Sequence, residues 1–342
     1  DVPRIDFTDD PTGHLLLEPQ STNLETESAA LTAGWSVVTG ATSQIETSIT
    51  PFGVSGNVYK LTNATNNPPS WGSSNILKKQ YAVSATNPAS FYTFSVYVKS
   101  AGSTTINIQS RDNSNGPSVT TGLISLSSEW QRVTISKQFT TSTTAVGVVI
   151  AGTDGDILLA DAQFEQQSYA TSYIPTSGSI STRNQELCNN SGTVNDFNSE
   201  EGVLYAEIAA LADDLTNREI ALSDGTSNNR VELRFTSNSN EIQVVVRAID
   251  GAVQTARQTS AYTITNFNKI AISYKVNDFS FWVNGVKAGG DTSGNTPIGL
   301  SELAFDNGDG NNLFFGKTKN VKAFKRALTD AELYLLTVTQ YQ

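Results

Sequence analysis

Side chains that could donate a proton, accept one or attack a substrate are scarce in this sequence. Its 342 residues include one histidine, His14, and one cysteine, Cys188. A single histidine excludes a two-histidine metal centre, and a single cysteine excludes an intrachain disulfide and a thiolate zinc site. His14 is the one imidazole that could act as the base of a serine triad, and it lies in a segment without strand or helix periodicity. The sequence therefore predicts little nucleophilic catalysis.

Carboxylates give no catalytic pattern either. A retaining glycosidase needs two carboxyl groups about 5 to 5.5 Å apart, and a strand can supply them from one of its faces. The spacing Glu-x-Asp-x-x-Glu, which would provide such a pair, does not occur in the sequence. No tyrosine or histidine with a cationic neighbour forms the cluster that a polysaccharide lyase uses. We therefore expect a protein that binds its partner without cleaving it.

Polar and aromatic side chains of the first half could bind a sugar. An aromatic ring can lie against the apolar face of a pyranose, while amides, carboxylates and guanidinium groups bond its hydroxyls. Alternation sets such side chains opposite the apolar ones, and a tryptophan lies in the loop NNPPSWGSS. The predicted ligand-binding residues are Trp71, Tyr97, Asn107, Gln109 and Arg111. The alternative is that Trp71 fills a loop, Tyr97 packs on its neighbours and Arg111 ends a strand in solvent.

A comparable polar face is predicted in the second half. Three charged residues alternate there with valine, leucine and phenylalanine, and one tryptophan alternates with phenylalanine and valine. The predicted ligand-binding residues of this half are Glu232, Arg234, Arg247 and Trp282. The alternative is a cross-strand ladder of opposite charges, with the tryptophan covering an arm or the other domain.

These faces require β-strands, and the sequence has the matching period. In FYTFSVYVKS, from Phe91 to Ser100, Tyr, Phe and Val side chains recur at every second position. Clusters of Gly, Asn, Ser and Pro separate such runs at the short intervals of a β-sandwich. A second series of runs begins near Gly202, and Asn284-Gly285 predicts a two-residue hairpin turn. Near the end, LTDAELYLL predicts a short helix with Thr329 as its N-cap.

The sequence thus predicts an all-β protein of two β-sandwich (jelly-roll) domains in series, with a short C-terminal helix. The length fits two domains. The first 25 residues lack strand rhythm, so residues 1–30 are predicted to form an irregular N-terminal arm that lies along the first domain, which follows over 31–175. A segment poor in apolar side chains predicts a linker at 176–200, and the second domain follows at 201–342.

Charge and hydropathy argue against two classes of partner. The chain has 33 Asp and Glu against 22 Lys and Arg, a net charge of −11, and no basic cluster. Nucleic-acid affinity depends on cations that neutralise phosphates, so we expect no nucleic-acid partner. Apolar runs such as VGVVIA at 146–151 fall far short of the ~20 residues that a membrane helix needs. We therefore expect no membrane insertion.

Several segments together resemble a known family. HLLLEPQSTNL with Trp35 further on, SEWQRVTI at 128–135, GDILLADAQFE at 155–165 and ATSYIPTSGSISTR at 170–183 resemble a jelly-roll module of bacteriophage tail and fibre proteins. That module is similar to carbohydrate-binding modules of the family 4/9 type. EIALSDGTSNNRVELRF, NKIAISYKVNDFSFWVNGV and KAFKRALTDAEL resemble concanavalin A-like or laminin G-like domains attached to phage structural proteins.

This resemblance implies a non-catalytic virion protein, in a tail, a fibre or a decoration, that attaches to surface polysaccharide. The expected partners are a polysaccharide or cell-surface glycan and other virion proteins, in a homotrimer at the virion surface or outside the cell. Similar virion proteins continue upstream of the PRIDF segment, so an anchoring part is expected to be missing before Asp1. Two alternatives stay open: a purely architectural virion protein, and polysaccharide-binding modules of a secreted bacterial carbohydrate-active protein.

The resemblance also implies a structural calcium, although no cofactor is expected to be required. Similar jelly-rolls carry an aspartate at the position of Asp161, and Asp154 and Asp156 lie close to it in the sequence. Carboxylate oxygens are the ligands that calcium prefers. In the second half, Asp306 and Asp309 share a loop, but their spacing departs from the twelve-residue calcium loop and favours a turn.

Overall fold

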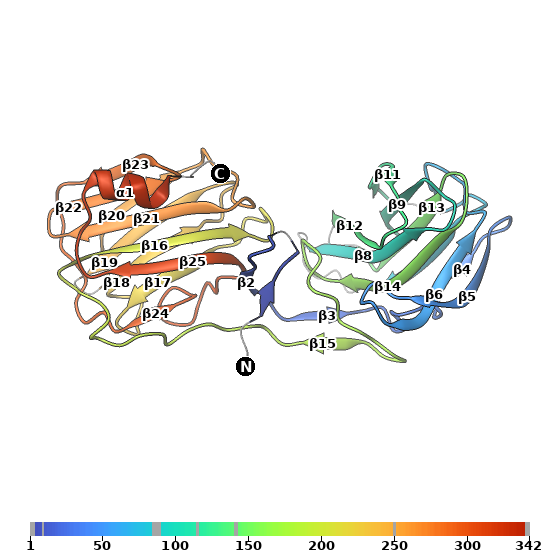
Figure 1. Cartoon of the computed structure of the whole chain (residues 1–342), viewed down its shortest axis with the longest axis horizontal. Coiled ribbons are helices and arrows are strands. Elements are labelled where there is room, and N and C mark those ends of the chain that lie inside the picture. Colours follow the sequence, from blue (N-terminus) through green and yellow to red (C-terminus); the bar gives the residue numbers. More distant parts are fainter. Residues whose placement is uncertain are drawn as a thin grey trace. The chain divides into compact units, whose positions relative to one another are not determined.

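The computed structural model of the chain describes residues 4–8, 10–83, 90–113, 116–139, 143–248 and 251–338. The chain divides into two compact units, Gln20–Asn184 and Asp1–Pro19 with Gln185–Gln342. We call them the jelly-roll unit and the C-terminal unit. Both are built from antiparallel strands, and the described residues form one α-helix (Figure 1). The predicted all-β class, with β-sandwich domains and a short C-terminal helix, is confirmed.

Two main sheets make up the jelly-roll unit. The first, called the β9 sheet, has the order β10-β9-β13-β7-β4, with β11 also paired to β9. Its strands are β4 (Ser36–Val37), β7 (Leu77–Ala82), β9 (Thr105–Asp112), β10 (Ser118–Thr120), β11 (Ile124–Ser125) and β13 (Ala145–Gly152). The second, called the β8 sheet, has the order β12-β8-β14-β6-β5. Its strands are β5 (Thr42–Ile49), β6 (Ser55–Thr62), β8 (Phe91–Ser100), β12 (Gln131–Gln138) and β14 (Ile157–Glu165).

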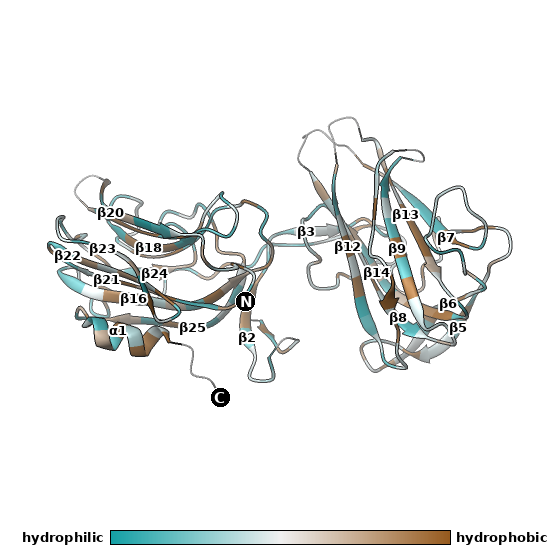
Figure 2. Ribbon diagram, turned by 90° about the horizontal axis from the view of Figure 1, so that it is seen from above, coloured by the Kyte–Doolittle hydropathy of each residue, from teal (hydrophilic) through white to brown (hydrophobic). Residues whose placement is uncertain are grey.

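The period of two explains why these runs fold as a sandwich. Along β9, Ile106 and Ile108 are fully buried in the core between the sheets, and the polar residues between them lie on the outer face. Along β8, Phe94 and Val96 are buried in the same core. Figure 2 shows this alternation as teal and brown segments along single strands such as β9. Each sheet therefore keeps one outer face on which functional side chains can lie.

The C-terminal unit also has two main sheets. A seven-stranded sheet has the order β1-β2-β25-β16-β21-β22-β23, and a five-stranded sheet has the order β20-β19-β18-β17-β24. The seven strands are β1 (Ile5–Asp6), β2 (His14–Leu17), β16 (Glu201–Ala210), β21 (Asn268–Lys275), β22 (Asp278–Val283), β23 (Val286–Asp291) and β25 (Gly316–Phe324). The five strands are β17 (Arg218–Ser223), β18 (Arg230–Phe235), β19 (Ile242–Ala248), β20 (Ala252–Thr259) and β24 (Glu302–Ala304).

The predicted hairpin and helix both lie in this unit. Asn284 and Gly285 have positive φ between β22 and β23, as the two-residue turn requires. The helix α1 (Asp330–Thr337) begins with a capping box, in which Thr329 and Glu332 satisfy each other's backbone N–H groups. Among the described residues, no helix is long and apolar enough to cross a membrane.

The first 30 residues differ from the predicted irregular arm. Within the described part, His14–Leu17 form β2, which pairs with β25 and so extends the seven-stranded sheet (Figure 1). Ser21–Asn23 form β3, which pairs with β15 (Ser181–Arg183) in the jelly-roll unit. Strands this short, with polar and apolar residues buried alike, show no alternation in the sequence. The segment therefore contributes to both units instead of lying along the first.

The predicted linker at 176–200 also belongs to the two units. Ser181–Arg183 form β15, and the Glu186 N–H donates to the Glu18 carbonyl within the C-terminal unit. Ser191 makes an isolated β-bridge with Leu303. Although this segment has few apolar side chains, its backbone N–H and C=O groups still find partners, and these partners order it.

Candidate functional site

The outer face of the β9 sheet collects four of the five predicted residues of the first half. The register pairs Asn107 with Ala151, Gln109 with Val149 and Arg111 with Gly147 across β9 and β13. The three polar side chains therefore follow one another along one side of the sheet, opposite the buried isoleucines. The small partners on β13 leave room above the sheet.

Trp71 occupies that room. It lies in the loop between β6 and β7, half-buried, and packs against Val149 and Ala151. A Cβ placed on Gly147 would lie 2.8 Å from Cζ3 of Trp71, so the absence of a side chain there lets the ring lie directly on the strand. The Lys78 ammonium lies 4.8 Å from the ring centroid and donates to the Trp71 carbonyl at 2.9 Å. We call Trp71, Lys78, Asn107, Gln109 and Arg111 the Trp71 face.

The polar side chains of the Trp71 face are fixed by hydrogen bonds, but one of their acceptor atoms has no hydrogen-bond partner in the described chain. The Asn107 amide donates to Oδ1 of Asn67 at 2.8 Å, and Nε of Arg111 donates to the Asn113 carbonyl at 3.1 Å. Burial lowers the pKa of the Arg111 guanidinium below its ordinary value. Gln109 is 7% exposed, and its Oε1 has no hydrogen-bond partner within the described chain. An oriented acceptor without a donor therefore lies beside the ring and the cation.

Tyr97 lies elsewhere. It belongs to β8, which is in the other sheet of the sandwich, so the five predicted residues of the first half do not share a face. Its register partners are Ala160 on β14 and Arg132 on β12, and the Arg132 guanidinium lies 5.7 Å from its ring centroid. Alternation assigns a residue to the core or to an outer face, but it does not reveal which of the two sheets a strand joins.

The predicted set of the C-terminal unit is divided in the same way. Glu232, Arg234 and Arg247 lie on β18 and β19, outside the buried valines and leucines of the five-stranded sheet. Trp282 lies on β22 of the seven-stranded sheet, where it packs against Leu333 and Leu336 of α1 and is 8% exposed. The helix covers the indole, so Trp282 offers no open ring to a ligand.

A buried carboxylate pair dominates the face that keeps the charged residues. The pair consists of Glu232, which was predicted, and Glu219, which the sequence analysis did not identify. Both are fully buried. Arg234 forms ion pairs with Glu219 at 3.4 Å and with Glu232 at 3.3 Å, and Arg230 binds Glu232. Burial, and then the charge of Glu232, raises the pKa of Glu219 to about 7. These opposite charges form a cross-strand ladder between β17 and β18, which is the alternative reading of the sequence.

The three predicted calcium ligands are not gathered. Asp154 bonds Ser103, Thr104 and Thr153 in the turn before β14, and Asp156 forms an ion pair with Lys60 at 3.3 Å. Asp161 lies farther along β14, at a bulge with φ of 52°, and is hydrogen-bonded to Tyr173. Within the described ranges, no three His, Cys, Asp or Glu side chains form a group that could hold a metal ion. The calcium stays a prediction.

Glu25, which directly follows the HLLLEPQSTNL segment, and Trp35 have a structural role instead. Glu25 is fully buried beneath the jelly-roll surface. It accepts hydrogen bonds from the Lys79 ammonium at 2.6 Å, the Tyr81 hydroxyl at 2.8 Å and the Trp35 indole N–H at 3.0 Å. Because Lys79 and Tyr81 lie on β7, these hydrogen bonds attach the chain around Glu25 to the β9 sheet. Glu25 and the Trp35 indole N–H therefore serve the fold of the jelly-roll unit.

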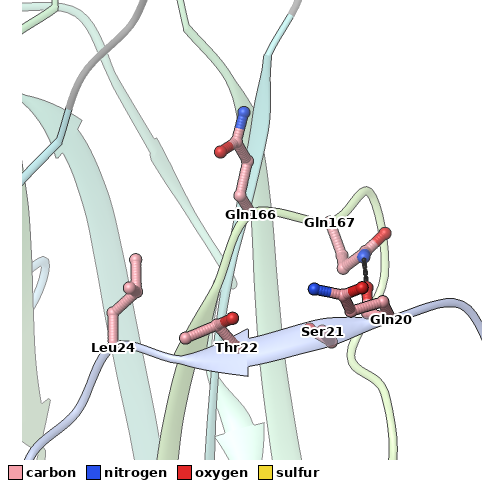
Figure 3. Close-up of a pocket in the computed structure, with 6 residues that line it drawn as sticks. All are labelled: Gln20, Ser21, Thr22, Leu24, Gln166 and Gln167. Carbon is pink, nitrogen blue, oxygen red and sulfur yellow. Dashed lines mark hydrogen bonds between the residues drawn. The ribbon is translucent and has the colours of Figure 1, made fainter. Parts of the chain in front are cut away.

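A hollow lies beside β3 (Figure 3). Its volume is about 330 Å³ and it is lined by Gln20, Ser21, Thr22, Leu24, Gln166 and Gln167. The Gln167 amide donates to the Gln20 carbonyl at 3.0 Å, and Gln166 points away from this pair. The lining has hydrogen-bonding groups but no aromatic ring, so a sugar has nothing to stack on there. The Trp71 face is therefore the better candidate.

Comparison with known families supports one half of the expected architecture. A laminin G-type family model, described as the concanavalin A-like lectin/glucanases superfamily, matches residues 209–334. The match supports the predicted resemblance to a concanavalin A-like or laminin G-like domain over that part of the chain. No curated protein matches the chain.

Solved structures resemble the chain only distantly. The enzymatically active domain of tailspike protein 4 from bacteriophage CBA120 has 12% identity and a TM-score of 0.30, over 39% of this chain and 19% of that one. The CBM22-1 xylan-binding domain of Xyn10C from Paenibacillus barcinonensis has 15% identity and a TM-score of 0.29, over 44% and 94%. Domains LG4-5 of the mouse laminin alpha1 chain have 10% identity and a TM-score of 0.29, over 92% and 97%.

Proposed function

We propose that this chain binds a polysaccharide without cleaving it, and that the Trp71 face of the jelly-roll unit makes the main contact. The observation that carries the proposal is the close packing of the Trp71 ring on the backbone of Gly147, beside Gln109 and Arg111. One surface thus combines a flat ring, two amides and a guanidinium group.

The chemistry of a sugar ring matches this combination. The axial C–H groups of a pyranose form an apolar patch that packs on an aromatic ring, and its hydroxyls both donate and accept hydrogen bonds. Oε1 of Gln109 is buried without a donor, and a buried acceptor costs about 1–3 kcal/mol until a donor reaches it. The Gln109 amide would have to turn outward for a sugar hydroxyl to supply that donor, and this turn would remove a penalty that the free protein carries.

The side chains on this face favour binding over hydrolysis. Among the described strands, the register places Gln80, Gly147, Val149 and Ala151 beside the side chains of the Trp71 face, and no carboxylate is among them. A glycosidase needs two carboxyl groups around the scissile bond. The buried pair Glu219 and Glu232 does not meet this need, because both are enclosed by arginines and out of reach of solvent.

The proposal includes a biological setting, which rests on the sequence resemblance alone. We infer an attachment protein at a virion surface, or outside a cell, that meets host glycan together with other virion proteins. Each sugar site gains little free energy, because hydroxyls exchange bonds with water for bonds with protein. A homotrimer would add avidity by presenting several sites on one particle.

Affinity electrophoresis of the full chain, in gels that contain xylan, mixed-linkage β-glucan or galactomannan, tests the proposal. We expect retention on at least one of them and at least a tenfold weaker affinity for Trp71→Ala. Leu335→Ala is the matched control, because it removes an apolar side chain that is 68% exposed on α1. The proposal is wrong if no polysaccharide retains the wild type, if Trp71→Ala is retained equally, or if the polymer is shortened.

A further inference from the structure

Three aromatic rings meet on the opposite side of the jelly-roll unit. Phe52, in the turn between β5 and β6, lies 5.6 Å from Tyr173 at an interplanar angle of 19°. Its centroid is also 5.6 Å from that of Tyr97, at an angle of 65°. Tyr97 comes from β8 and Tyr173 from the segment after β14, so three separate parts of the chain build the cluster. None of the rings belongs to the buried core between the sheets.

Phe52 is exposed although it is held in place. The side chain is 56% accessible to solvent, and Tyr173 supports one of its faces. The turn that carries it includes Gly53, with φ of 76° and no atom near the position of its absent Cβ. A ring that is backed by a second ring and open to water on its other side is a preformed stacking surface.

Polar groups surround the cluster and fix it. Arg132 lies over the Tyr97 ring and donates to the Ser95 hydroxyl at 2.8 Å and to the Thr171 carbonyl at 2.7 Å. It therefore links β12, β8 and the segment that carries Tyr173. The Tyr173 hydroxyl is within 2.6 Å of Oγ of Ser28 and is also bonded to Asp161.

Two atoms close to the cluster lack partners in the described chain. They are Nε of Arg132, a donor, and Oδ2 of Asp161, an acceptor. Asp161 is 6% exposed, so its oxygen is withheld from bulk water. The rim of the cluster thus contains a cation and a carboxyl group, which suit a ligand with hydroxyl groups better than an apolar protein surface.

We propose that Phe52, Tyr97 and Tyr173 form a second carbohydrate site, which takes one pyranose ring stacked on the open face of Phe52. The ring packs on Phe52, and its hydroxyls reach the polar rim around Arg132. The site lies on the β8 sheet, so it is separate from the Trp71 face on the β9 sheet. This inference extends the proposed function, since it assigns the same class of ligand to a second surface.

Saturation-transfer difference NMR tests the second site directly. The probes are methyl β-D-xylopyranoside and methyl β-D-glucopyranoside at millimolar concentration, with the full chain. The variants are Trp71→Ala, Phe52→Ala, Phe52→Tyr, Val54→Ala and the double variant of Trp71→Ala with Phe52→Ala. Val54→Ala is the matched control, because this residue is 61% exposed in the same turn and has no ring.

We expect Trp71→Ala to keep a signal on the ring protons of the probe, and the double variant to lose at least four-fifths of it. Phe52→Tyr and Val54→Ala should keep the signal of the wild type, because the first retains a ring and the second removes none. The inference is overturned if the double variant gives the same signal as Trp71→Ala. It is also overturned if Phe52→Ala changes only self-association in ultracentrifugation, which would make the ring a protein contact.

The two proposals fail in different ways. If Phe52→Ala behaves as the wild type and Trp71→Ala loses all binding, the second site is absent and the proposed function stands. If Trp71→Ala behaves as the wild type and Phe52→Ala loses binding, the Trp71 face is wrong and the second site stands.

Discussion

At the residue scale, the candidate binding surface depends on Gly147, because this residue has no side chain beneath the Trp71 ring. It lies on β13 between Arg111 and Gln80, at a position where strands of this kind usually carry a β-branched side chain. The missing Cβ lets the Trp71 ring approach the strand closely, and glycine weakens a strand interior, so the position has a cost in stability. The benefit is a ring fixed before any ligand arrives.

The first prediction concerns this contact. In Gly147→Ala the new Cβ would lie 2.8 Å from Cζ3 of Trp71 and 3.0 Å from Cγ of Arg111, so the ring must move. We expect an affinity for the retaining polysaccharide about five- to tenfold weaker, measured by affinity electrophoresis. Gly72→Ala is the control, because no atom lies within 4 Å of its added Cβ. Equal retention of both variants would show that the position of the ring does not matter.

The second prediction concerns Glu219, whose pKa burial raises from the ordinary 4.5 to about 7. A raised pKa means that the folded state binds this proton more tightly than the unfolded state does. The resulting stability is complete below the unfolded pKa and is lost as the pH rises from 4.5 to about 7. The free energy of unfolding should fall by on the order of 2 kcal/mol over this window.

Urea unfolding at the two ends of the window measures the effect. Glu219→Gln cannot titrate, so its stability should change less with pH than that of the wild type. Glu129→Gln, at an exposed position of the jelly-roll unit, is the control and should follow the wild type. Parallel pH profiles for all three proteins would contradict the assignment of the proton to this buried pair.

At the scale of elements, the long strands could be predicted from the sequence and the short ones could not. The alternation in FYTFSVYVKS predicts β8 correctly, because eight or more residues repeat the period of two. β2 has four residues and buries His14 along with Leu16 and Leu17, so polarity and burial do not coincide there. Its position depends on pairing with β25, which no local pattern reports.

The residues of the candidate sites also divide into those that local alternation can predict and those that depend on contacts between distant parts of the chain. Alternation correctly separated Asn107, Gln109 and Arg111 from the core, but it could not assign Tyr97 to a sheet. Phe52 lies in a turn, where no period applies, and its neighbours come from distant strands. Glu219 looks like any solvent-facing glutamate until its cross-strand partner Arg234 is known.

The third prediction tests the place of β2. Leu17 is 5% exposed and packs in the core of the C-terminal unit, although it precedes the jelly-roll unit in the sequence. Leu17→Ala should lower the stability of the C-terminal unit by about 2–5 kcal/mol. Hydrogen exchange read by mass spectrometry should show faster exchange in β16 and β25, and unchanged exchange in β8 and β14. Faster exchange in the jelly-roll strands alone would place Leu17 in the other unit.

At the scale of the molecule, the jelly-roll unit is inserted into the C-terminal unit rather than placed before it. The chain forms β1 and β2 of one unit, then all of Gln20–Asn184, and then returns to complete the first. An inserted unit is attached by two crossings of the chain instead of one. Neither unit can therefore be removed by a single cut without leaving part of the other behind.

This order of strands has a consequence during synthesis on the ribosome. Leu15 pairs with Thr318, so almost the entire chain must be translated before β2 can meet β25. At roughly 5–20 residues per second, that delay lasts on the order of 15 to 60 seconds. The intervening unit has all of its own strands within that time and can fold first. Until the last strand emerges, Leu16 and Leu17 remain uncovered, and a chaperone or a neighbouring nascent chain can occupy them.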